Sequence, residues 1–364
     1  MKKVLIDINH PAHVHLFRHF IQEMKSRGND VIVMAKDVDS ITNLLKLYKI
    51  DYISTGRKKD HILQKYFYEF FHLLKVLGIV LRRRVDYGIG VSMVLPLVSK
   101  LTSMKSFALD DDDLAATPIF GKFTSYADVI LNPDALTHEE RGSRRLCHPS
   151  YHELAYLHPN RFVPEPTILR DIGLQPGEPF FILRFNAFKA HHDAGAQGLS
   201  TGQKLKIIEF LKNFGRIFIT TERTIEPALR AYQLPVSPEK IHSLLYYATL
   251  FVGDSQTMTT EAALLGTPAL KLNSFAGRLS IPNELEHRYQ LCFSYQPHEF
   301  AALMDKIEEL MLTDDVKAIW QARQDAMLRD KVDLTTFLTT LVTNYPASIA
   351  RLKPELAMAN HRKL

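Results

Sequence analysis

The segment with the strongest chemical signal runs from residue 250 to residue 268. An apolar strand over 250–252 ends at Gly253, the polar residues 254–257 turn the chain, and a short helix follows. Hydroxyl side chains cap the start of a helix, and the unpaired backbone N–H groups of its first turn attract anions. The pattern therefore predicts a diphosphate site at the carboxyl end of a buried strand.

The polar side chains of this segment extend the predicted site beyond the turn. The hydroxyls of Ser255 and Thr257 would lie beside the open N–H groups, in the turn that also holds Asp254 and Gln256. Glu261 follows about one helical turn later, and its carboxylate can accept two hydrogen bonds from the diol of a ribose or hexose. An ordinary capped helix needs only the two hydroxyl residues, so the convergence of polar groups favours a ligand site.

Three histidines follow the first predicted strand, within residues 9–15. Pro11 suits the first helical position, which puts His10 near the cap and His13 in the opening turn, and both are candidate catalytic residues beside an acceptor hydroxyl. A neutral His13 that faces a cleft could take the proton from an acceptor hydroxyl as it attacks an anomeric carbon. His15 is expected to point away and to pack. A metal site of His13 and His15 is disfavoured, because histidines two residues apart diverge on a helix.

Four consecutive aspartates, residues 110–113, follow an apolar run over 107–109. Alternate aspartates match the pattern with which some transferases hold a divalent ion on a nucleotide sugar. The run lies in the N-terminal half, however, away from the predicted phosphate site. We interpret it as the N-terminal cap of a helix, with Asp110 able to reach an acceptor.

Charged side chains also follow two predicted strands of the second half. Arg184 ends the strand at 180–183, so it can face a cleft as a fixed cation for a diphosphate. Glu222 ends the next strand and is likewise a candidate binding residue of the cleft. For either side chain, the alternative is a surface ion pair. The loop over 186–200 is long and contains glycine, and with His192 it suits a sugar-binding loop or lid.

The elements that must position these groups alternate between strand and helix. Strands are expected near 4–8, 31–34, 52–53, 87–91, 106–109, 129–131, 180–183, 217–219, 250–252 and 269–272. Such alternation predicts parallel sheets covered by helices on both faces, with ligands at the carboxyl ends of the strands. The expected architecture is α/β, with two doubly wound domains facing a cleft.

A cluster of prolines between residues 158 and 179 interrupts the alternation and indicates a linker. We therefore expect four parts, which are an acceptor-side domain at 1–160, a linker at 161–179, a nucleotide-sugar-binding domain at 180–345 and a tail at 346–364.

Length and composition narrow the function classes. The 364 residues are 46% hydrophobic, enough to build two cores. Cys147 and Cys292 are too few for a disulfide framework or a four-cysteine zinc site, which favours a reducing cytoplasm. A net charge of +5 indicates no nucleic-acid partner on a chain of this size. The N-terminus enters a predicted strand directly, so no signal peptide is expected.

One long amphipathic helix is predicted over residues 62–81. Its apolar residues recur at helical spacing, at Ile62, Tyr66, Phe67, Phe70, Phe71, Leu74, Leu77 and Leu81. Basic triplets lie before and after it, at 57–59 and 82–84. We interpret the apolar stripe as a face that packs within the protein. The alternative is a peripheral contact of residues 57–84 with anionic lipid headgroups at the inner face of a membrane.

The segment over 250–268 resembles the donor-binding motif of the GT-B glycosyltransferases and of the related UDP-N-acetylglucosamine 2-epimerases. The shared features are the strand, the Asp-Ser turn, Glu261 and the closing Gly-Thr-Pro. This resemblance implies that Ser255 and Thr257 contact phosphate and that Glu261 contacts ribose. Relatives often carry a Gly-Gly pair where this chain has Gln256 and Thr257, and side chains there limit how closely backbone approaches phosphate.

Four further segments resemble a prokaryotic family known as a domain of unknown function and predicted to contain glycosyltransferases. They are residues 7–15, 151–159, 183–185 and 191–193. The similarity spans nearly the whole chain and implies the GT-B fold, in which two Rossmann-like domains face a cleft.

We therefore expect a metal-independent glycosyltransferase without a cofactor. It would move a sugar from a nucleotide-diphosphate sugar to a glycan or lipid-linked acceptor, with the leaving-group charge met by the helix dipole and Arg184. Two alternatives stay open. A sugar-nucleotide epimerase would need acids and bases on both faces of the sugar ring, and a non-catalytic protein would bind the nucleotide sugar without turning it over.

Overall fold

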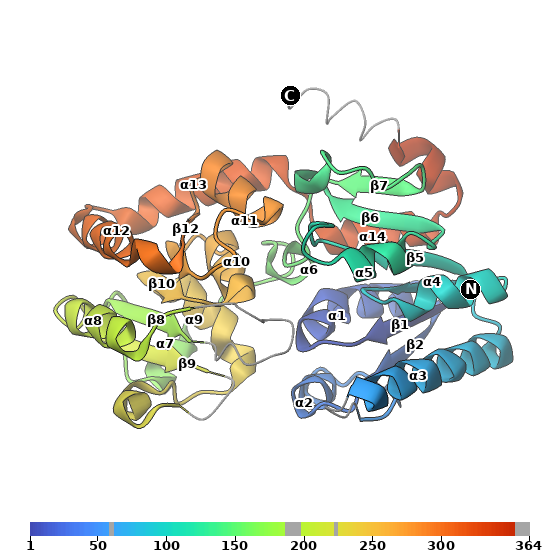
Figure 1. Ribbon diagram of the computed structural model, residues 1–364, viewed down its shortest axis with the longest axis horizontal. Helices are drawn as coiled ribbons and strands as arrows, with labels where there is room; N and C mark the ends of the chain where they lie inside the picture. The colour runs from blue at the N-terminus through green and yellow to red at the C-terminus, as the bar shows by residue number, and fades with distance from the viewer. Residues whose placement is uncertain (58–61, 186–197, 222–224, 354–364) are drawn as a thin grey trace. The chain divides into compact units, whose positions relative to one another are not determined.

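The computed structural model describes residues 1–57, 62–185, 198–221 and 225–353 of the chain (Figure 1). Its contacts divide the protein into two units. The first combines Met1–Arg161 with the segment that begins at Lys331, and the second is Phe162–Asp330. Each unit is built around a parallel β-sheet.

The first unit contains a seven-stranded sheet in the order β3-β2-β1-β4-β5-β6-β7. Its strands are β1 (Lys3–Ile8), β2 (Asp30–Ala35), β3 (Ile53–Ser54), β4 (Tyr87–Gly90), β5 (Lys105–Leu109), β6 (Val129–Pro133) and β7 (Arg145–His148). Its helices are α1 (Pro11–Ser26), α2 (Asp39–Leu47), α3 (Ile62–Arg83), α4 (Val94–Leu101), α5 (Pro118–Thr124), the 3₁₀ turn η1 (Asp134–Leu136), α6 (Leu154–Leu157) and α14 (Leu334–Thr343).

The second unit contains a five-stranded sheet in the order β12-β11-β10-β8-β9. Its strands are β8 (Phe180–Arg184), β9 (Arg216–Thr220), β10 (Leu250–Gly253), β11 (Ala269–Leu272) and β12 (Cys292–Tyr295). Its helices are α7 (Thr167–Asp171), α8 (Thr201–Leu211), α9 (Ile241–Tyr247), α10 (Gln256–Leu264), α11 (Ser280–Asn283), α12 (Phe300–Leu312) and α13 (Val316–Asp330). Short helical turns are η3 (Pro227–Tyr232), η4 (Pro238–Lys240), the π-turn η5 (Glu284–Arg288) and η6 (Pro297–Glu299).

The central strands are apolar along almost their whole length because both faces of each sheet are covered. Leu5 and Ile6 of β1 are completely buried, as are Phe251 and Val252 of β10. Continuous apolar runs of this kind are typical of parallel sheets. The predicted class, α/β with two doubly wound parallel sheets, is confirmed.

The boundaries of the two units differ from the expected domains. The chain returns to the first unit at Lys331, whereas the sequence placed the second domain at 180–345. Helix α14 packs against α1 and α6 and buries Leu338 and Leu341. An amphipathic helix shows that it needs an apolar partner, but its own sequence does not say which unit supplies that partner. The expected linker at 161–179 contains α7 and, from Phe162 onward, belongs to the second unit.

Helix α3 corrects the prediction for its apolar stripe. Val76 and Val80 are its buried contacts with the core, whereas most described members of the predicted stripe are exposed. The exposed members are Phe70, Phe71, Leu74 and Leu81. The predicted stripe is therefore not the main packing face. A second apolar arc of the helix, which includes Val76 and Val80, covers the sheet. Within the described residues, every helix is too short or too polar to cross a bilayer.

Candidate functional site

Both sheets have a point at which the chain reverses its direction of winding. In the first sheet this point lies between β1 and β4, and in the second it lies between β8 and β10. Loops diverge there at the carboxyl ends of the strands, which makes these positions the usual ligand sites of doubly wound folds. Most of the site residues predicted from the sequence lie at one of these two edges.

At the second sheet, hydrogen bonds from backbone and side chains fix the turn from β10 into α10. The N–H of Asp254 donates to the Arg184 carbonyl at 3.1 Å, and the side-chain amide of Asn273 donates to the Asp254 carbonyl at 3.0 Å. Ser255 is the N-cap of α10, and its hydroxyl accepts from the N–H of Met258 at 3.5 Å. The predicted capping role is thus present, and it orients the first turn of the helix.

The first turn of α10 keeps open donors. The backbone N–H groups of Gln256 and Thr257 find no acceptor among the residues that the structure describes, and Thr257 is exposed. These groups carry the positive end of the helix dipole. The turn predicted to bind phosphate can therefore still donate to a ligand.

Two buried cations flank the end of β10. Gly253 is in register with Arg184 of β8 on one side and with Lys271 of β11 on the other. Residues in register on parallel strands present their side chains on the same face of a sheet. A Cβ atom on Gly253 would lie 2.4 Å from the Arg184 carbonyl oxygen, so the strand approaches this closely only with glycine.

The ammonium of Lys271 is completely buried and donates to the side-chain oxygen of Gln256, the first residue of α10. Burial lowers the pKa of Lys271 to about 8. The guanidinium of Arg184 donates to the Thr220 hydroxyl at 3.0 Å. Sequence reasoning missed Lys271, although a lysine inside the apolar run Ala-Leu-Lys-Leu was a signal for a buried charge.

Glu261 lies further along α10 and is buried. Its carboxylate contacts Nε2 of His242, from α9, at 3.0 Å. Its contact with ribose stays a prediction. Glu222 and His192, the other two predicted binding residues, lie outside the described residues.

At the first sheet, His10 and His13 occupy the predicted positions at the start of α1. His10 is the N-cap, and its Nδ1 accepts from the N–H of Ala12 at 3.2 Å. Nδ1 of His13 accepts from the N–H of Asn9 at 3.3 Å. Burial, together with the charges of His10 and His152, lowers the pKa of His13 to about 3.

These contacts decide which role His13 can take. An imidazole with such a low pKa is neutral at pH 7, as predicted, but it is a weak base. Because Nδ1 already accepts a hydrogen bond, the proton of the neutral ring belongs on Nε2. His13 would therefore present an N–H donor to a ligand. Its predicted role as the base stays without a test.

Asp7 of β1 has three polar partners at the carboxyl edge of the first sheet. It accepts from the Ser92 hydroxyl at 2.5 Å and from the Asn9 amide at 2.8 Å, and it forms an ion pair of 3.2 Å with His72 of α3. Burial opposes the imidazolium form, but Asp7 and Glu69 outweigh it and raise the pKa of His72 to about 9.

The aspartate run after β5 does not cap a helix, which corrects that prediction. Residues 114–116 form a turn, and α5 begins only at Pro118 with Thr117 as its N-cap. Buried Asp110 instead forms an ion pair of 2.5 Å with Arg141. Its predicted contact with an acceptor stays a prediction.

Asp111 and His152 form a second pair at this edge. Oδ2 of Asp111 lies 3.0 Å from Nδ1 of His152, which is 8% exposed. Nε2 of His152 is buried and has no hydrogen-bond partner among the described residues. Burial works against the imidazolium, but Asp111 outweighs it and raises the pKa of His152. A carboxylate that fixes one ring nitrogen leaves the other to exchange a proton.

The Asp111–His152 pair was not predicted from the sequence. Asp111 appeared only as part of the aspartate run, and His152 appeared only within a segment that carried the family resemblance. The residues are 41 positions apart, and only the arrangement of β5 and β7 brings them together.

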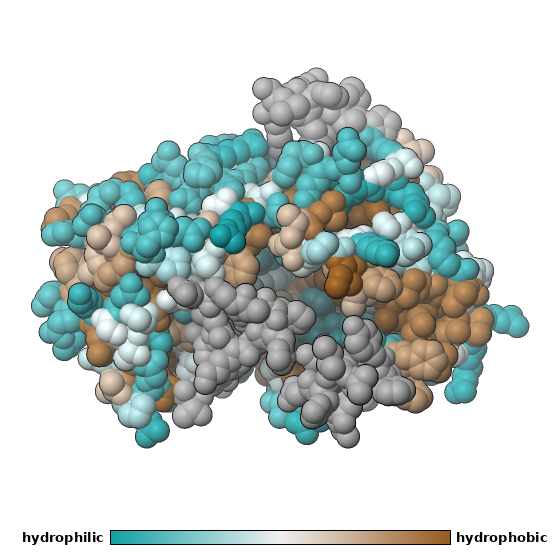
Figure 2. Space-filling view, in the orientation of Figure 1, coloured by the Kyte–Doolittle hydropathy of each residue, from teal (hydrophilic) through white to brown (hydrophobic). Residues whose placement is uncertain are grey.

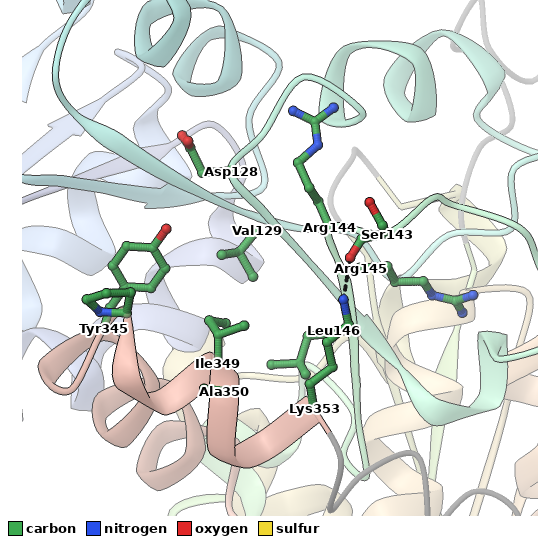
Figure 3. Close-up of a pocket in the computed structure, with 11 residues that line it drawn as sticks. Asp128, Val129, Ser143, Arg144, Arg145, Leu146, Tyr345, Ile349, Ala350 and Lys353 are labelled. Atoms are coloured by element: carbon green, nitrogen blue, oxygen red, sulfur yellow. Dashed lines mark hydrogen bonds between the residues drawn. The ribbon is translucent and has the colours of Figure 1, made fainter.

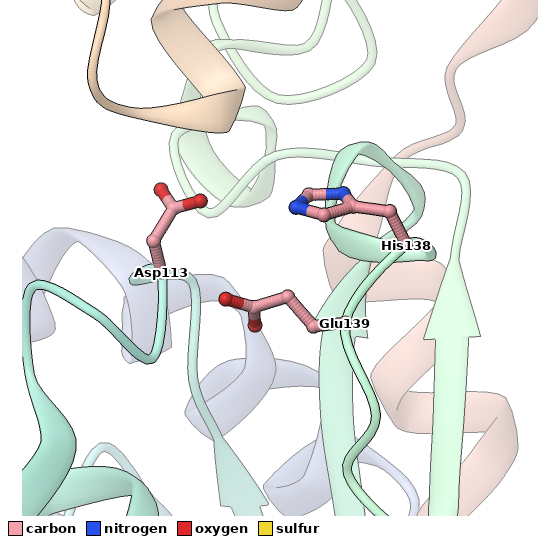
Figure 4. A group of neighbouring side chains, drawn as sticks. All are labelled: Asp113, His138 and Glu139. Carbon is pink, nitrogen blue, oxygen red and sulfur yellow. The ribbon is translucent and has the colours of Figure 1, made fainter.

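Asp113, His138 and Glu139 place one potential ligand atom each within 4.8 Å of one another (Figure 4). Glu139 already uses both oxygens, because Oε1 accepts from the N–H of Leu114 at 2.7 Å and Oε2 pairs with Arg141 at 2.5 Å. We therefore make no metal assignment for this group.

A pocket of about 330 Å³ lies beside β6, β7 and the segment after α14, with Tyr345 and Lys353 in its lining (Figure 3). Asp128 and Arg145 mark its position at the amino ends of the two strands. It thus lies at the opposite edge of the sheet from the predicted site, where doubly wound folds do not usually bind ligands.

Solved structures similar to this chain share a fold of two Rossmann-like domains. UDP-GlcNAc 2-epimerase from Neisseria meningitidis bound to UDP-GlcNAc is 11% identical, with a TM-score of 0.68 over 94% of this chain and 100% of that one. Spinosyn rhamnosyltransferase SpnG, complexed with spinosyn aglycone, is 10% identical, with a TM-score of 0.60 over 94% and 100%. Glycosyltransferase VinC in complex with dTDP is 11% identical, with a TM-score of 0.63 over 99% and 100%.

The predicted GT-B fold is confirmed, in the form shared by glycosyltransferases and UDP-GlcNAc epimerases. The family described as protein of unknown function (DUF354) matches residues 2–281, and the chain belongs to this family. None of the curated protein sequences compared with the chain matches it.

Proposed function

We propose that this protein is a glycosyltransferase that uses a nucleotide-diphosphate sugar as donor and needs no metal ion. The observation that carries the proposal is the register of Arg184, Gly253 and Lys271, which places two buried cations beside the open first turn of α10. A diphosphate carries charge of opposite sign and fits both the dipole of the helix and the two cations.

The same groups suit the chemistry of sugar transfer. When the bond between sugar and diphosphate breaks, negative charge builds up on the departing phosphate oxygen. Fixed cations and backbone N–H groups in a site with little water stabilise that charge without having to reorganise. Lys271 is well suited to this role because burial already costs its charged form stability, which an anion would restore.

For the acceptor side we assign proton transfer to His152. Asp111 orients its ring, and Nε2 remains for the acceptor hydroxyl. His13 lies close enough to His152 for the charge of His152 to lower its pKa, and the Nε2–H of the neutral His13 ring would orient the acceptor as a hydrogen-bond donor. Within this proposal, Ser255 and Thr257 contact the phosphates of the donor and Glu261 contacts its ribose. Asp110 contacts the acceptor.

Epimerisation of a nucleotide sugar is the second candidate. The structure of the Neisseria epimerase holds UDP-GlcNAc in the same overall fold. The titratable groups around His152 and Asp111 would also suit proton abstraction from a sugar ring. This reaction needs no acceptor, and that difference separates the two candidates experimentally.

The test incubates the purified protein with a panel of nucleotide-diphosphate sugars in D₂O, with and without oligosaccharide and lipid-linked acceptors. Transfer predicts release of the nucleoside diphosphate only when an acceptor is present. Epimerisation predicts an epimer or free glycal without acceptor, with deuterium in the sugar ring. Binding of the donor without either reaction would leave a non-catalytic binding protein, and absence of binding would contradict all three.

A further inference from the structure

Helix α3 has a hydrophobic face that nothing in the described structure covers. Phe70 and Phe71 are 56% and 63% exposed, and Leu74 and Leu81 are 46% and 59% exposed. At 100° per residue, Phe70, Leu74 and Leu81 fall within one narrow arc of the helix, with Phe71 at its edge. Exposed aromatic and leucine side chains gathered in this way mark a surface that binds something.

This face is part of a wider apolar area. Helix α4 packs against α3 and ends in Leu101, which is 64% exposed. Figure 2 shows a continuous hydrophobic area where Figure 1 draws α3 and α4. We call the exposed side chains of Phe70, Phe71, Leu74, Leu81 and Leu101 the α3 face.

The exposed charges that α3 and its C-terminal triplet present beside the α3 face are of one sign. Lys75 and the triplet 82–84 are exposed cations on and just after α3. Between residues 68 and 83 the helix has a single acidic residue, Glu69, which lies on the other side and pairs with Lys36 at 3.5 Å. An apolar strip bordered by cations is complementary to the headgroup region of an anionic bilayer.

The opposite side of α3 connects this surface to the carboxyl edge of the first sheet. His72 is 1% exposed and forms its ion pair with Asp7 of β1, next to Asn9 and the start of α1. Val76 and Val80 add apolar packing to the core. The helix is therefore anchored on one side and apolar on the other, which is the arrangement of an interfacial helix.

We propose that α3 lies in the plane of an anionic membrane surface, with the α3 face inserted among the lipid acyl chains and the flanking cations at the headgroups. The inference does not depend on the proposed sugar transfer. It would bring the first unit to a surface where amphiphilic acceptors are concentrated. A second copy of the chain is the competing occupant, but the surrounding cations would face one another across such an interface and repel.

The test is co-sedimentation of the full-length protein with vesicles of phosphatidylcholine alone and with vesicles that also contain phosphatidylglycerol. We expect binding to the anionic vesicles that is at least tenfold tighter and that weakens at high salt. The double variant Phe71→Ser, Leu74→Ser should lose this binding at least tenfold, and R82E with R83E should lose most of it.

Matched controls separate membrane binding from loss of structure. Val163 and Leu312 belong to the second unit and are 83% and 70% exposed. The double variant Val163→Ser, Leu312→Ser should bind vesicles as the wild type does, and all variants should unfold at the wild-type temperature. Equal binding to both vesicle types, no binding, or unchanged binding by the α3 variants would overturn the proposal. Dimers in light scattering that the α3 variants dissociate would assign the face to a second copy instead.

Discussion

The carboxyl edges of the two sheets carry different electrostatics. In the second sheet, Arg184 donates to the Thr220 hydroxyl at the end of β9, and Lys271 donates to the Gln256 side chain at the open start of α10. In the first sheet, the charged groups pair with one another, as in His72 with Asp7 and His152 with Asp111. This difference indicates that the two edges have different roles. The carboxyl edge of the second sheet attracts an anion, and that of the first sheet holds proton-transfer groups in fixed orientations.

The largest effect is expected at His152. His152→Gln should lower turnover of a nucleotide sugar by about 1,000-fold, because a positioned acid or base contributes 10²–10⁴-fold. Nucleotide affinity, measured by calorimetry, should stay unchanged because it depends on the other sheet. His138→Gln, at an exposed histidine of the same unit, should keep full turnover. Retention of more than a tenth of wild-type turnover in the His152 variant would remove this residue from the proposal.

A pH effect on stability is expected from His72. Its folded pKa of about 9 lies above the usual 6.5, so the stabilisation is complete below pH 6.5 and is lost as the pH rises through 9. The full effect is about 3 kcal/mol, at 1.36 kcal/mol per pKa unit. Lys271, with its folded pKa lowered to about 8, contributes a pH dependence of opposite sign to every variant that keeps it, so the effect of His72 is the difference between wild type and His72→Gln. In denaturant unfolding between pH 6.5 and 9.5, the stability of the wild type relative to His72→Gln should fall by this amount. A difference that stays constant over this range would mean that His72 does not titrate as stated.

A smaller effect, on the affinity for a diphosphate, is expected at the start of α10. Thr257→Asp places a negative charge on the first turn, where it should repel a diphosphate and weaken its binding by about tenfold. The same charge favours the helix dipole, so the unfolding free energy should stay constant or rise slightly. Thr257→Ser serves as the control. A loss of affinity together with a loss of stability would indicate misfolding of the turn instead.

The two helix caps give the smallest effects and distinguish the two edges. Ser255→Ala and His10→Ala each remove a side chain that accepts from the first turn of a helix. Each should lower the unfolding free energy by about 1 kcal/mol or less. Only the Ser255 variant should also weaken nucleotide binding, measured by the same titration. Equal losses of nucleotide affinity in both variants would contradict the assignment of nucleotide binding to the second sheet alone.

Local patterns predicted the local structure around Ser255 well. The strand, the polar turn and the helix around Ser255 follow one another directly between Leu250 and Leu264, so their order alone indicates the geometry. Lys271 could not be found this way, because its place beside Gly253 depends on the register of two strands. The contacts of His242 with Glu261 and of His152 with Asp111 could not be predicted either, because the partners are distant in the sequence.

Helix α3 shows a different limit of sequence reasoning. Its periodicity identified an amphipathic helix, but apolar residues occur on two arcs, and only one of them covers the sheet. Hydrophobic spacing indicates that a face is apolar and does not indicate which partner covers it. The return of the chain into the first unit at Lys331 was missed for a similar reason, because the partners of α14 are α1 and α6.

The most direct test of the account is calorimetric titration of nucleotide-diphosphate sugars into wild-type protein and Lys271→Met from pH 7 to pH 9. Wild-type binding should weaken as the pH rises through about 8 and Lys271 loses its charge. The variant should bind at least about tenfold more weakly at pH 7, without this pH dependence, and stay folded because methionine replaces a buried cation. Absence of wild-type binding, or a variant with the same affinity and pH profile, would contradict the account.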